Sequence, residues 1–217
     1  TATLKALSSN QVQAIETDDI QALTSAQMST LTTATVAALS TDQVQALQTS
    51  QLNKLNTAGV NALSTDQVVA LTTAQVSSLT TGAVQALSTS AIAALETDDI
   101  QALSTNSLGA LKTNQVEALS TNQVVALTTA QIGGLSTGTI KALSSNQVAA
   151  IETDDIQALS SKQLGSLATN TIAALTTDQV VALTTSQVST LATATLKALS
   201  SNQVQAIETD DIQALTS

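Results

Sequence analysis

The chain contains no Phe, Tyr, Trp, Pro, Cys, His or Arg. Because there is no Cys, no disulfide can form. Because there is no aromatic residue, any core must be built from Leu, Val, Ile and Ala, which suits many thin identical layers better than one thick centre. Nucleic-acid binding usually needs Lys or Arg contacts to phosphates and aromatic stacking on bases. The chain has only six Lys and no aromatic residue, so we expect no nucleic-acid partner.

The chain also lacks the side chains that most often take part in catalysis. His, Cys and Arg are missing, and no carboxylate lies in a setting that predicts a shifted pKa, so we expect neither an enzyme nor a bound cofactor. No apolar run approaches transmembrane length, and membrane insertion is not expected. The net charge of −10 should keep a long array soluble and self-repelling.

The sequence repeats with a period of eight residues. A Leu or Ile recurs at every eighth position from Leu7 to Leu215, and a second column, from Leu4 to Ile212, holds only Val, Ile, Leu or Met. A third column, from Thr1 to Ser217, holds only Thr or Ser. A fixed period of this kind is the signature of a repeat architecture.

The period predicts one solenoid segment over residues 1–217, made of 27 octapeptides. Residues 193–217 are identical to residues 1–25, which suggests a fragment of a longer array. A shorter segment is repeated at an offset of seven octads, for example at 95–104 and 151–160. Seven octads in two turns would fit that offset, but plain duplication fits it equally well, so the number of octads per turn stays open.

Three backbone conformations compete for the octad. A continuous helix would move each Leu about 80° around its surface, which leaves no apolar stripe. A strand would send Val44 and Leu47 to opposite faces, and Ala and Gln are poor strand formers. We therefore predict an all-α solenoid of very short helices, about six residues each, with a β-solenoid as the alternative.

Each short helix needs a start signal and a buried face. We assign Thr41 as an N-cap whose hydroxyl accepts a backbone N–H, with helical residues from Asp42 to Leu47. The predicted N-caps in this region are Thr41, Thr49, Thr57, Thr65 and Thr73. Val44 and Leu47 lie on one helix face, and the predicted spine contains Leu39, Val44, Leu47, Leu63, Val68 and Leu71.

Acidic segments with the sequence ETDDI form the only charge clusters. Their carboxylates are Glu16, Asp18, Asp19, Glu96, Asp98, Asp99, Glu152, Asp154, Asp155, Glu208, Asp210 and Asp211. Three carboxylates in four residues could bind Ca²⁺, which makes these residues weak metal candidates. The favoured interpretation is that both Asp residues lie in the first helical turn, where the helix dipole favours negative charge, and that Glu ends the preceding helix in solvent.

Two polar columns have two interpretations each. The Thr/Ser column could order water as an ice-binding array, although capping explains it without further assumptions. The Gln column, which includes Gln43, Gln67, Gln75 and Gln123, could form hydrogen-bonded ladders along the stack or could be a solvated helix position. We favour partial laddering.

Runs such as LSTDQVVALTTAQV at 63–76 resemble octapeptide-repeat regions of giant secreted or surface proteins of bacteria, of the RTX-like or haemagglutinin-like adhesin kind. The resemblance covers the whole chain and implies an extracellular or cell-surface location and a long repetitive stalk. It implies no catalytic or binding residue, and the Gly-Asp calcium nonapeptides of RTX proteins are absent.

The sequence thus predicts a structural spacer that projects adhesive or effector domains. We expect it to have some elasticity and to contact the flanking repeats of its own array. The external ligand is unknown at this point. The alternative function is a binding module that uses its repeated surface for ice, glycan or Ca²⁺.

Overall fold

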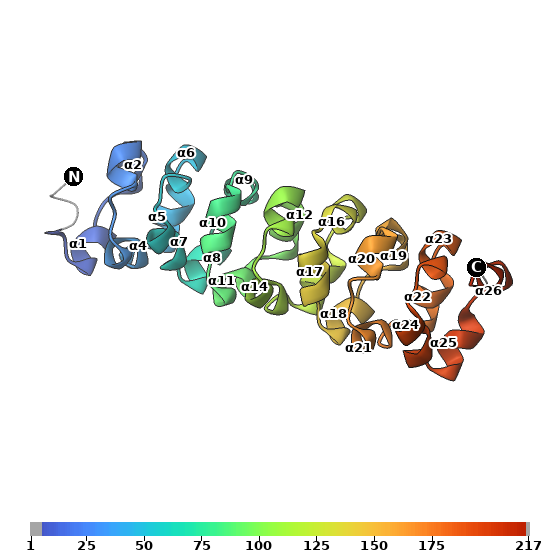
Figure 1. Cartoon of the computed structure of the whole chain (residues 1–217). Coiled ribbons are helices and arrows are strands. Elements are labelled where there is room, and N and C mark those ends of the chain that lie inside the picture. Colours follow the sequence, from blue (N-terminus) through green and yellow to red (C-terminus); the bar gives the residue numbers. More distant parts are fainter. Residues whose placement is uncertain (1–5, 216–217) are drawn as a thin grey trace. The chain divides into compact units, whose positions relative to one another are not determined.

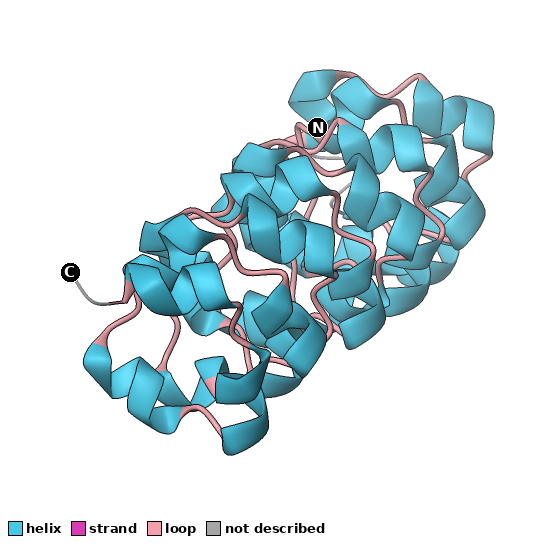
Figure 2. Ribbon diagram, turned by 90° about the vertical axis from the view of Figure 1, so that its right-hand side faces the viewer, coloured by secondary structure: helices cyan, strands magenta, loops and turns pink. Residues whose placement is uncertain are grey.

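The computed structural model describes residues 6–215. Within this range it contains 26 α-helices of four to six residues and no strand. Figure 2 shows these helices joined by short loops. The prediction of an all-α array of very short helices is confirmed, and the alternative of a β-solenoid is wrong.

The helices form two compact units, Thr1–Ser107 and Leu108–Ser217, and the boundary falls inside α13 (Thr105–Gly109). The first unit contains α1 (Ser9–Gln13), α2 (Thr17–Gln21), α3 (Ser25–Met28), α4 (Thr33–Ala38), α5 (Thr41–Ala46), α6 (Thr49–Leu52), α7 (Thr57–Asn61), α8 (Thr65–Val69), α9 (Thr73–Ser77), α10 (Thr81–Ala86), α11 (Thr89–Ala94) and α12 (Thr97–Ala102). Whether residues 1–217 form one continuous solenoid stays a prediction.

The second unit contains α14 (Thr113–Glu117), α15 (Thr121–Val125), α16 (Thr129–Gly134), α17 (Thr137–Ala142), α18 (Ser145–Ala149), α19 (Thr153–Ala158), α20 (Ser161–Leu164), α21 (Thr169–Ile172), α22 (Thr177–Val181), α23 (Thr185–Ser189), α24 (Thr193–Ala198), α25 (Ser201–Ala206) and α26 (Thr209–Ala214).

Within each unit, helices pack on those that follow three octads later. In the first unit the chain of contacts runs from α1 to α4, α7 and α10, with parallel series from α2 to α11 and from α3 to α12. The second unit repeats this pattern in the series that begin at α14, α15 and α16. Helices of successive turns can be followed side by side in Figure 1, for example α5 and α8.

One turn of each unit therefore takes three octads and has three sides. We call a series of helices stacked at intervals of three a side. The possibility of seven octads in two turns is wrong for both units. An offset of seven octads instead equals two turns and one further octad. Within a unit, two segments that are repeated at this offset therefore lie on different sides.

Each described helix ends at one of the three positions that precede a residue of the Leu column. Ser40, before α5, has extended backbone angles (φ −71°, ψ 163°), and Leu47, after it, is extended as well (φ −57°, ψ 134°). The helix therefore ends at Ala46, one residue earlier than we predicted. Fewer than two turns of helix are unstable alone in water, so the neighbouring turns must hold each one in place.

The apolar columns form the core of both units. Val44 and Val68 are fully buried, and Leu39, Leu47, Leu63 and Leu71 are between 3% and 6% exposed, so the predicted spine is confirmed. The Val/Ile column lies inside the helices, whereas the Leu column lies at the corner where one helix gives way to the next. Among residues 6–215 no helix is long and apolar enough to cross a membrane.

Candidate functional site

The N-cap residues of the helices in this region lie one position earlier than predicted. α5 begins at Thr41, but its N-cap is Ser40, whose Oγ accepts the backbone N–H of Gln43 at 3.1 Å. The same shift applies to the other four assignments, because the N-caps before Thr49, Thr57, Thr65 and Thr73 are Gln48, Asn56, Ser64 and Thr72. The five threonines are therefore the first helical residues, and their assignment as N-caps was wrong.

A capping box fixes this register. The backbone N–H of Ser40 donates to Oε1 of Gln43 at 2.8 Å while Gln43 N–H donates to the Ser40 hydroxyl. Two donors that the helix cannot satisfy internally are thus satisfied reciprocally. The signal was present in the sequence as Ser-x-x-Gln at 40–43, and the reasoning from the Thr column alone missed it.

The same Gln also bonds to the preceding turn. Nε2 of Gln43 donates to the carbonyl oxygens of Val12 and Ile15 at 2.9 and 2.7 Å. These carbonyls lie at or just beyond the C-terminal end of α1, where a short helix offers few internal donors. One buried side-chain amide therefore caps the start of its own helix and the end of a helix in the turn before.

This bridge recurs in both units with the same spacing. In each case Nε2 reaches the carbonyl of a Leu or Ile 28 residues earlier, at 2.6–2.8 Å. The residues concerned are Gln43, Gln51, Gln67, Gln75, Gln147, Gln163, Gln179, Gln187 and Gln203. The prediction of laddering is confirmed in this form: each rung joins a Gln to the backbone of the preceding turn.

At two interruptions of the Gln column, Gly59 and Ala83, an Asn side chain makes contacts of the same kind. At Gly59 an added Cβ would lie 3.3 Å from Cγ2 of Val36, so the turn before comes close to the backbone there. The N-cap Asn56 accepts Gly59 N–H on Oδ1 and donates from Nδ2 to the carbonyl of Leu31. A shorter amide, placed three residues earlier, thus makes the same two kinds of contact.

A second Asn makes up for the absence of Gln at Ala83. Oδ1 of Asn53 accepts the N–H of Thr80, the N-cap of α10, at 3.1 Å. Nδ2 of Asn53 donates to the carbonyl of Ser78 at 2.7 Å. Asn53 therefore links its turn to the following one, and no buried side-chain N or O in residues 6–215 is left without a hydrogen-bond partner.

The ETDDI segments are placed differently from the prediction. Glu16, Glu96, Glu152 and Glu208 are exposed, but each is the N-cap residue of the following helix and does not end the preceding one. The first Asp of each segment is exposed in the first helical turn, as expected. The second Asp of each segment stands in the Gln column. Asp99, Asp155 and Asp211 are only 3–4% exposed, so the prediction that the acidic segments are solvated is wrong for these three residues.

Burial has an electrostatic consequence at Asp99. Loss of water raises the pKa of its carboxyl above the ordinary value, and the negative charges of Glu96 and Asp98 act in the same direction. A hydrogen bond from the Thr73 hydroxyl opposes this change. Thr73, which we had assigned as an N-cap, thus serves as a donor to a carboxylate in the next turn.

The carboxylates do not gather into one site. In residues 6–215 no group of three or more His, Cys, Asp or Glu side chains is arranged to hold a metal ion. In the first unit α2 and α12 lie on different sides, and in the second unit so do α19 and α26. The reason is that neither separation is a whole number of turns: ten octads separate α2 from α12, and seven separate α19 from α26.

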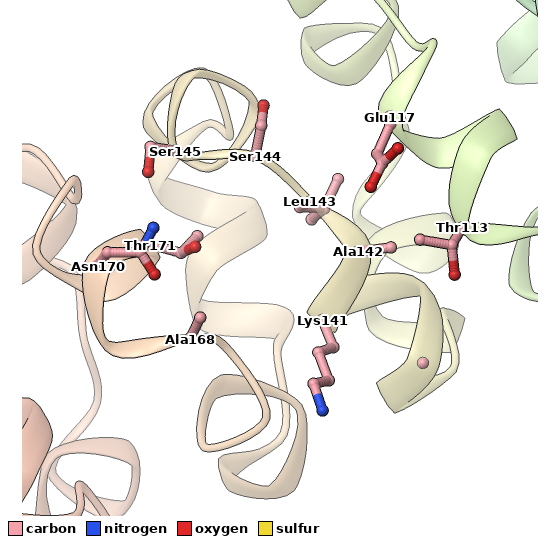
Figure 3. A pocket seen from close by; sticks show the side chains of 11 residues that line it. Thr113, Glu117, Lys141, Ala142, Leu143, Ser144, Ser145, Ala168, Asn170 and Thr171 are labelled. Carbon is pink, nitrogen blue, oxygen red and sulfur yellow. The ribbon is translucent and has the colours of Figure 1, made fainter.

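One hollow of the second unit lies over α14, α17, α18 and α21. It has a volume of about 790 Å³, and its lining includes Glu117, Lys141, Ser144, Ala168 and Asn170. Figure 3 shows Lys141 extending away from Glu117, with Asn170 on the far side of the hollow. Polar groups therefore surround the hollow without converging on one point, as a specific ligand site would require.

Three exposed valines recur at intervals of seven octads. Val69, Val125 and Val181 are between 42% and 46% exposed. Val125 is on α15 and Val181 on α22, which belong to different sides of the second unit. They form no continuous apolar stripe.

Comparison with known proteins identifies the repeat itself. The protein-family model described as ALTTAQ repeat matches residues 12–49, 44–81, 92–129, 102–137, 126–161, 148–185 and 185–217. The hexapeptide occurs in this chain at 70–75 and 126–131. Among curated proteins no sequence matches the chain. The tandem repeat inferred from the period of eight is thus confirmed over most of the chain.

Proposed function

We propose that this chain, which belongs to the ALTTAQ repeat family, is a structural spacer whose length is set by the number of its octads. The observation that carries the proposal is the repetition of one turn-to-turn contact. Within each unit, helices pack on those three octads before and after them, and the same Gln bridge recurs at a spacing of 28 residues.

Contacts of this kind make a quasi-one-dimensional molecule. Stability is then the sum of similar terms from each turn and its neighbours, and octads can be added or removed without redesigning a core. A globular domain of the same size would depend on contacts between distant parts of the sequence. Growth by duplication, visible in the identity of residues 1–25 and 193–217, suits a role in which length is the useful property.

The residues available for chemistry support a role without catalysis. There is no His, Cys or Arg in the chain, and the polar groups that are buried are engaged in capping or in bridges between turns. We infer that the protein is not an enzyme and that its main contacts are with flanking repeats. The acidic, Lys-poor surface is unsuited to phosphate backbones, which supports the absence of a nucleic-acid partner.

The larger context that we propose is a giant repeat protein of the bacterial surface or secretome, of the adhesin-like kind. In that setting the spacer would project an adhesive or effector domain away from the cell. The resemblance of the octads to such regions motivates this part of the proposal. Labelling of intact against permeabilised cells with an antibody to the octads would test it, and signal only after permeabilisation would contradict it.

Small-angle X-ray scattering tests the spacer role directly. We expect this protein and a tandem duplication of it to behave as rods, with a maximum dimension that roughly doubles on duplication. A matched protein that lacks residues 65–88, one whole turn, should be shorter and otherwise unchanged. A maximum dimension that grows only slightly on duplication, as for two globules packed together, would refute the proposal.

Binding assays separate the spacer from a binding module. Calorimetric titration with Ca²⁺, an ice-recrystallisation assay and a glycan array should each give no signal with this protein. A saturable signal in any of them, lost on substitution of the exposed threonines or the ETDDI carboxylates, would favour the binding module instead.

A further inference from the structure

The octads of the second unit are not all held equally firmly to the turn before. Gln163 and Gln179 each donate a side-chain N–H to a backbone carbonyl of that turn, at 2.8 Å to Leu135 and at 2.6 Å to Ile151. Asp155 stands in the same column and is 3% exposed. An ionised carboxylate has no proton to donate, so this octad cannot make the bridge.

The missing bridge leaves one backbone acceptor without a donor. The spacing of the other bridges shows that a Gln in place of Asp155 would donate to the carbonyl of Leu127, 28 residues earlier. Among the described residues no N–H or O–H group bonds to that carbonyl, although Leu127 is only 5% exposed. A buried acceptor without a donor costs free energy, so the stack is weakened between these two octads.

The start of α19 lacks a second kind of contact. Its N-cap residue, Glu152, makes no side-chain cap hydrogen bond, whereas Ser160 Oγ accepts Gln163 N–H at 3.3 Å at the start of α20. Glu152, Asp154 and Asp178 line one hollow at the start of α19, and no basic residue is part of its lining. The helices packed on α19, which are α16 and α22, contribute Asp178 and no Lys. Like charges therefore add repulsion where hydrogen bonds are already missing.

The neighbouring helix α21 is an intermediate case. Its N-cap residue, Ala168, makes no side-chain hydrogen bond either, and the Gln column is interrupted there by Thr171. A Thr carries no charge, however, and its hydroxyl can donate to an earlier turn, as Thr139 does to the Gly109 carbonyl at 3.0 Å. At α19 a missing cap, a missing bridge and a buried carboxylate coincide.

We propose that the ETDDI octads of α12 and α19 are built-in opening points, at which one turn of the stack separates locally while the turns around it stay folded. In the first unit α12 has the same combination, because Glu96 makes no cap hydrogen bond and Asp99 is 3% exposed. Segments with few stabilising contacts are the ones that open first in a native protein. The opening itself does not depend on the spacer role, but its use as a source of elastic extension rests on that proposed function.

Native-state hydrogen exchange at pH 7, followed by NMR for single residues, tests the proposal. In α19 the N–H groups of Ile156 and Leu159 donate to backbone carbonyls at 3.0 and 3.2 Å. In α22 those of Val180 and Leu183 do so at the same two distances. The local bonds are therefore matched, and a difference in exchange reports on the contacts between turns. We expect exchange in α19 to be at least about tenfold faster than in α22.

Three substitutions separate the missing donor from the charge. Asp155→Gln supplies the donor and should slow exchange at Ile156 and Leu159 at least about fivefold. Asp155→Glu has the length of Gln without its N–H groups and should not slow it. Asp154→Asn, the matched control, removes an exposed neighbouring charge without forming a bridge and should change exchange by less than about twofold.

The reverse substitution, Gln163→Asp, should create a new opening point in α20. Exchange at Leu164 and Leu167 should then become at least about fivefold faster, while Val180 in α22 stays protected. Equal exchange in α19 and α22 of the unmodified protein would overturn the proposal, and so would Asp155→Glu or Asp154→Asn slowing exchange as much as Asp155→Gln. None of these results depends on whether scattering shows a rod, so the opening points and the spacer role can fail separately.

Discussion

Nε2 of Gln75 donates to the carbonyl oxygen of Leu47 at 2.6 Å, across 28 residues of sequence. Oε1 of the same amide accepts the backbone N–H of Thr72 at 2.8 Å, so one side chain serves two helices in successive turns. Buried polar backbone groups are costly unless they are hydrogen-bonded, and helices this short have few internal partners to offer. The Gln column is therefore what makes such short helices compatible with a stack.

Substitution of Gln75 by Ala should lower the free energy of unfolding by about 2–4 kcal/mol, because it removes the partner of the Thr72 N–H and of the Leu47 carbonyl. Urea denaturation followed by circular dichroism measures this loss. The control is Gln45→Ala, two residues before Leu47 and exposed to solvent, which should change stability by less than about 0.5 kcal/mol. Equal effects at both positions would contradict the bridging role.

Neighbouring hydroxyls distinguish the true cap from the first helical residue. Ser64 Oγ accepts Gln67 N–H at 3.2 Å, whereas Thr65 is the first residue of α8. Ser64→Ala should cost about 1 kcal/mol of stability, the usual value of a lost N-cap. Thr65→Ala should be close to neutral. The reverse order would restore the original assignment of Thr65.

Replacement of Asp99 by Gln should stabilise the protein at neutral pH. Gln at this position can donate to the carbonyls of Val68 and Leu71, the groups in the preceding turn that match those bound by the other Gln residues. The substitution also removes a buried negative charge. Each new hydrogen bond contributes about 1 kcal/mol. Asp19→Gln, in the first turn, has no preceding turn to bond to and serves as the control. A melting temperature that rises equally in both variants would argue against the bridge.

The pH dependence of that gain follows from the pKa of Asp99, which burial raises in the folded state. A raised pKa means that the folded protein holds this proton more tightly than the unfolded chain does. Its contribution to stability is therefore fully present below the unfolded pKa and is lost as pH rises through the folded pKa. The advantage of Asp99→Gln should accordingly grow from acid towards neutral pH in thermal melts at a series of pH values, and a constant difference would contradict the assignment.

Two adjacent valines should differ in their contribution to the core. Val68 is fully buried and Val69 is 46% exposed on the same helix. Val68→Ala removes two buried methyl groups and leaves a cavity, at a cost of about 2 kcal/mol. Val69→Ala should be nearly neutral, because a more favourable helix propensity offsets the small area lost. Comparison of the two denaturation midpoints provides the measurement.

The period of eight was enough to predict short helices, because no other backbone puts Val44 and Leu47 on one buried face. The start of each helix was misplaced by one residue, because Ser40 and Thr41 are both competent caps and only the partnership with Gln43 separates them. The burial of Asp99 was also missed. Its exposure depends on the turn before it, and the homologous Asp19, with no such turn, is indeed exposed.

The sequence by itself determined the local unit: hydrophobic spacing, helix propensity and hydroxyl caps act over a few residues and can be counted along the chain. Only the tertiary structure decided that three octads make a turn, that Gln43 reaches Ile15, and that Asn56 takes over where Gly59 interrupts the column. These contacts join residues of successive turns. Their geometry depends on the angles between consecutive helices, which together decide how many octads complete one turn. A sequence pattern with a period of eight residues is the same for any number of octads per turn. The sequence therefore does not determine that number.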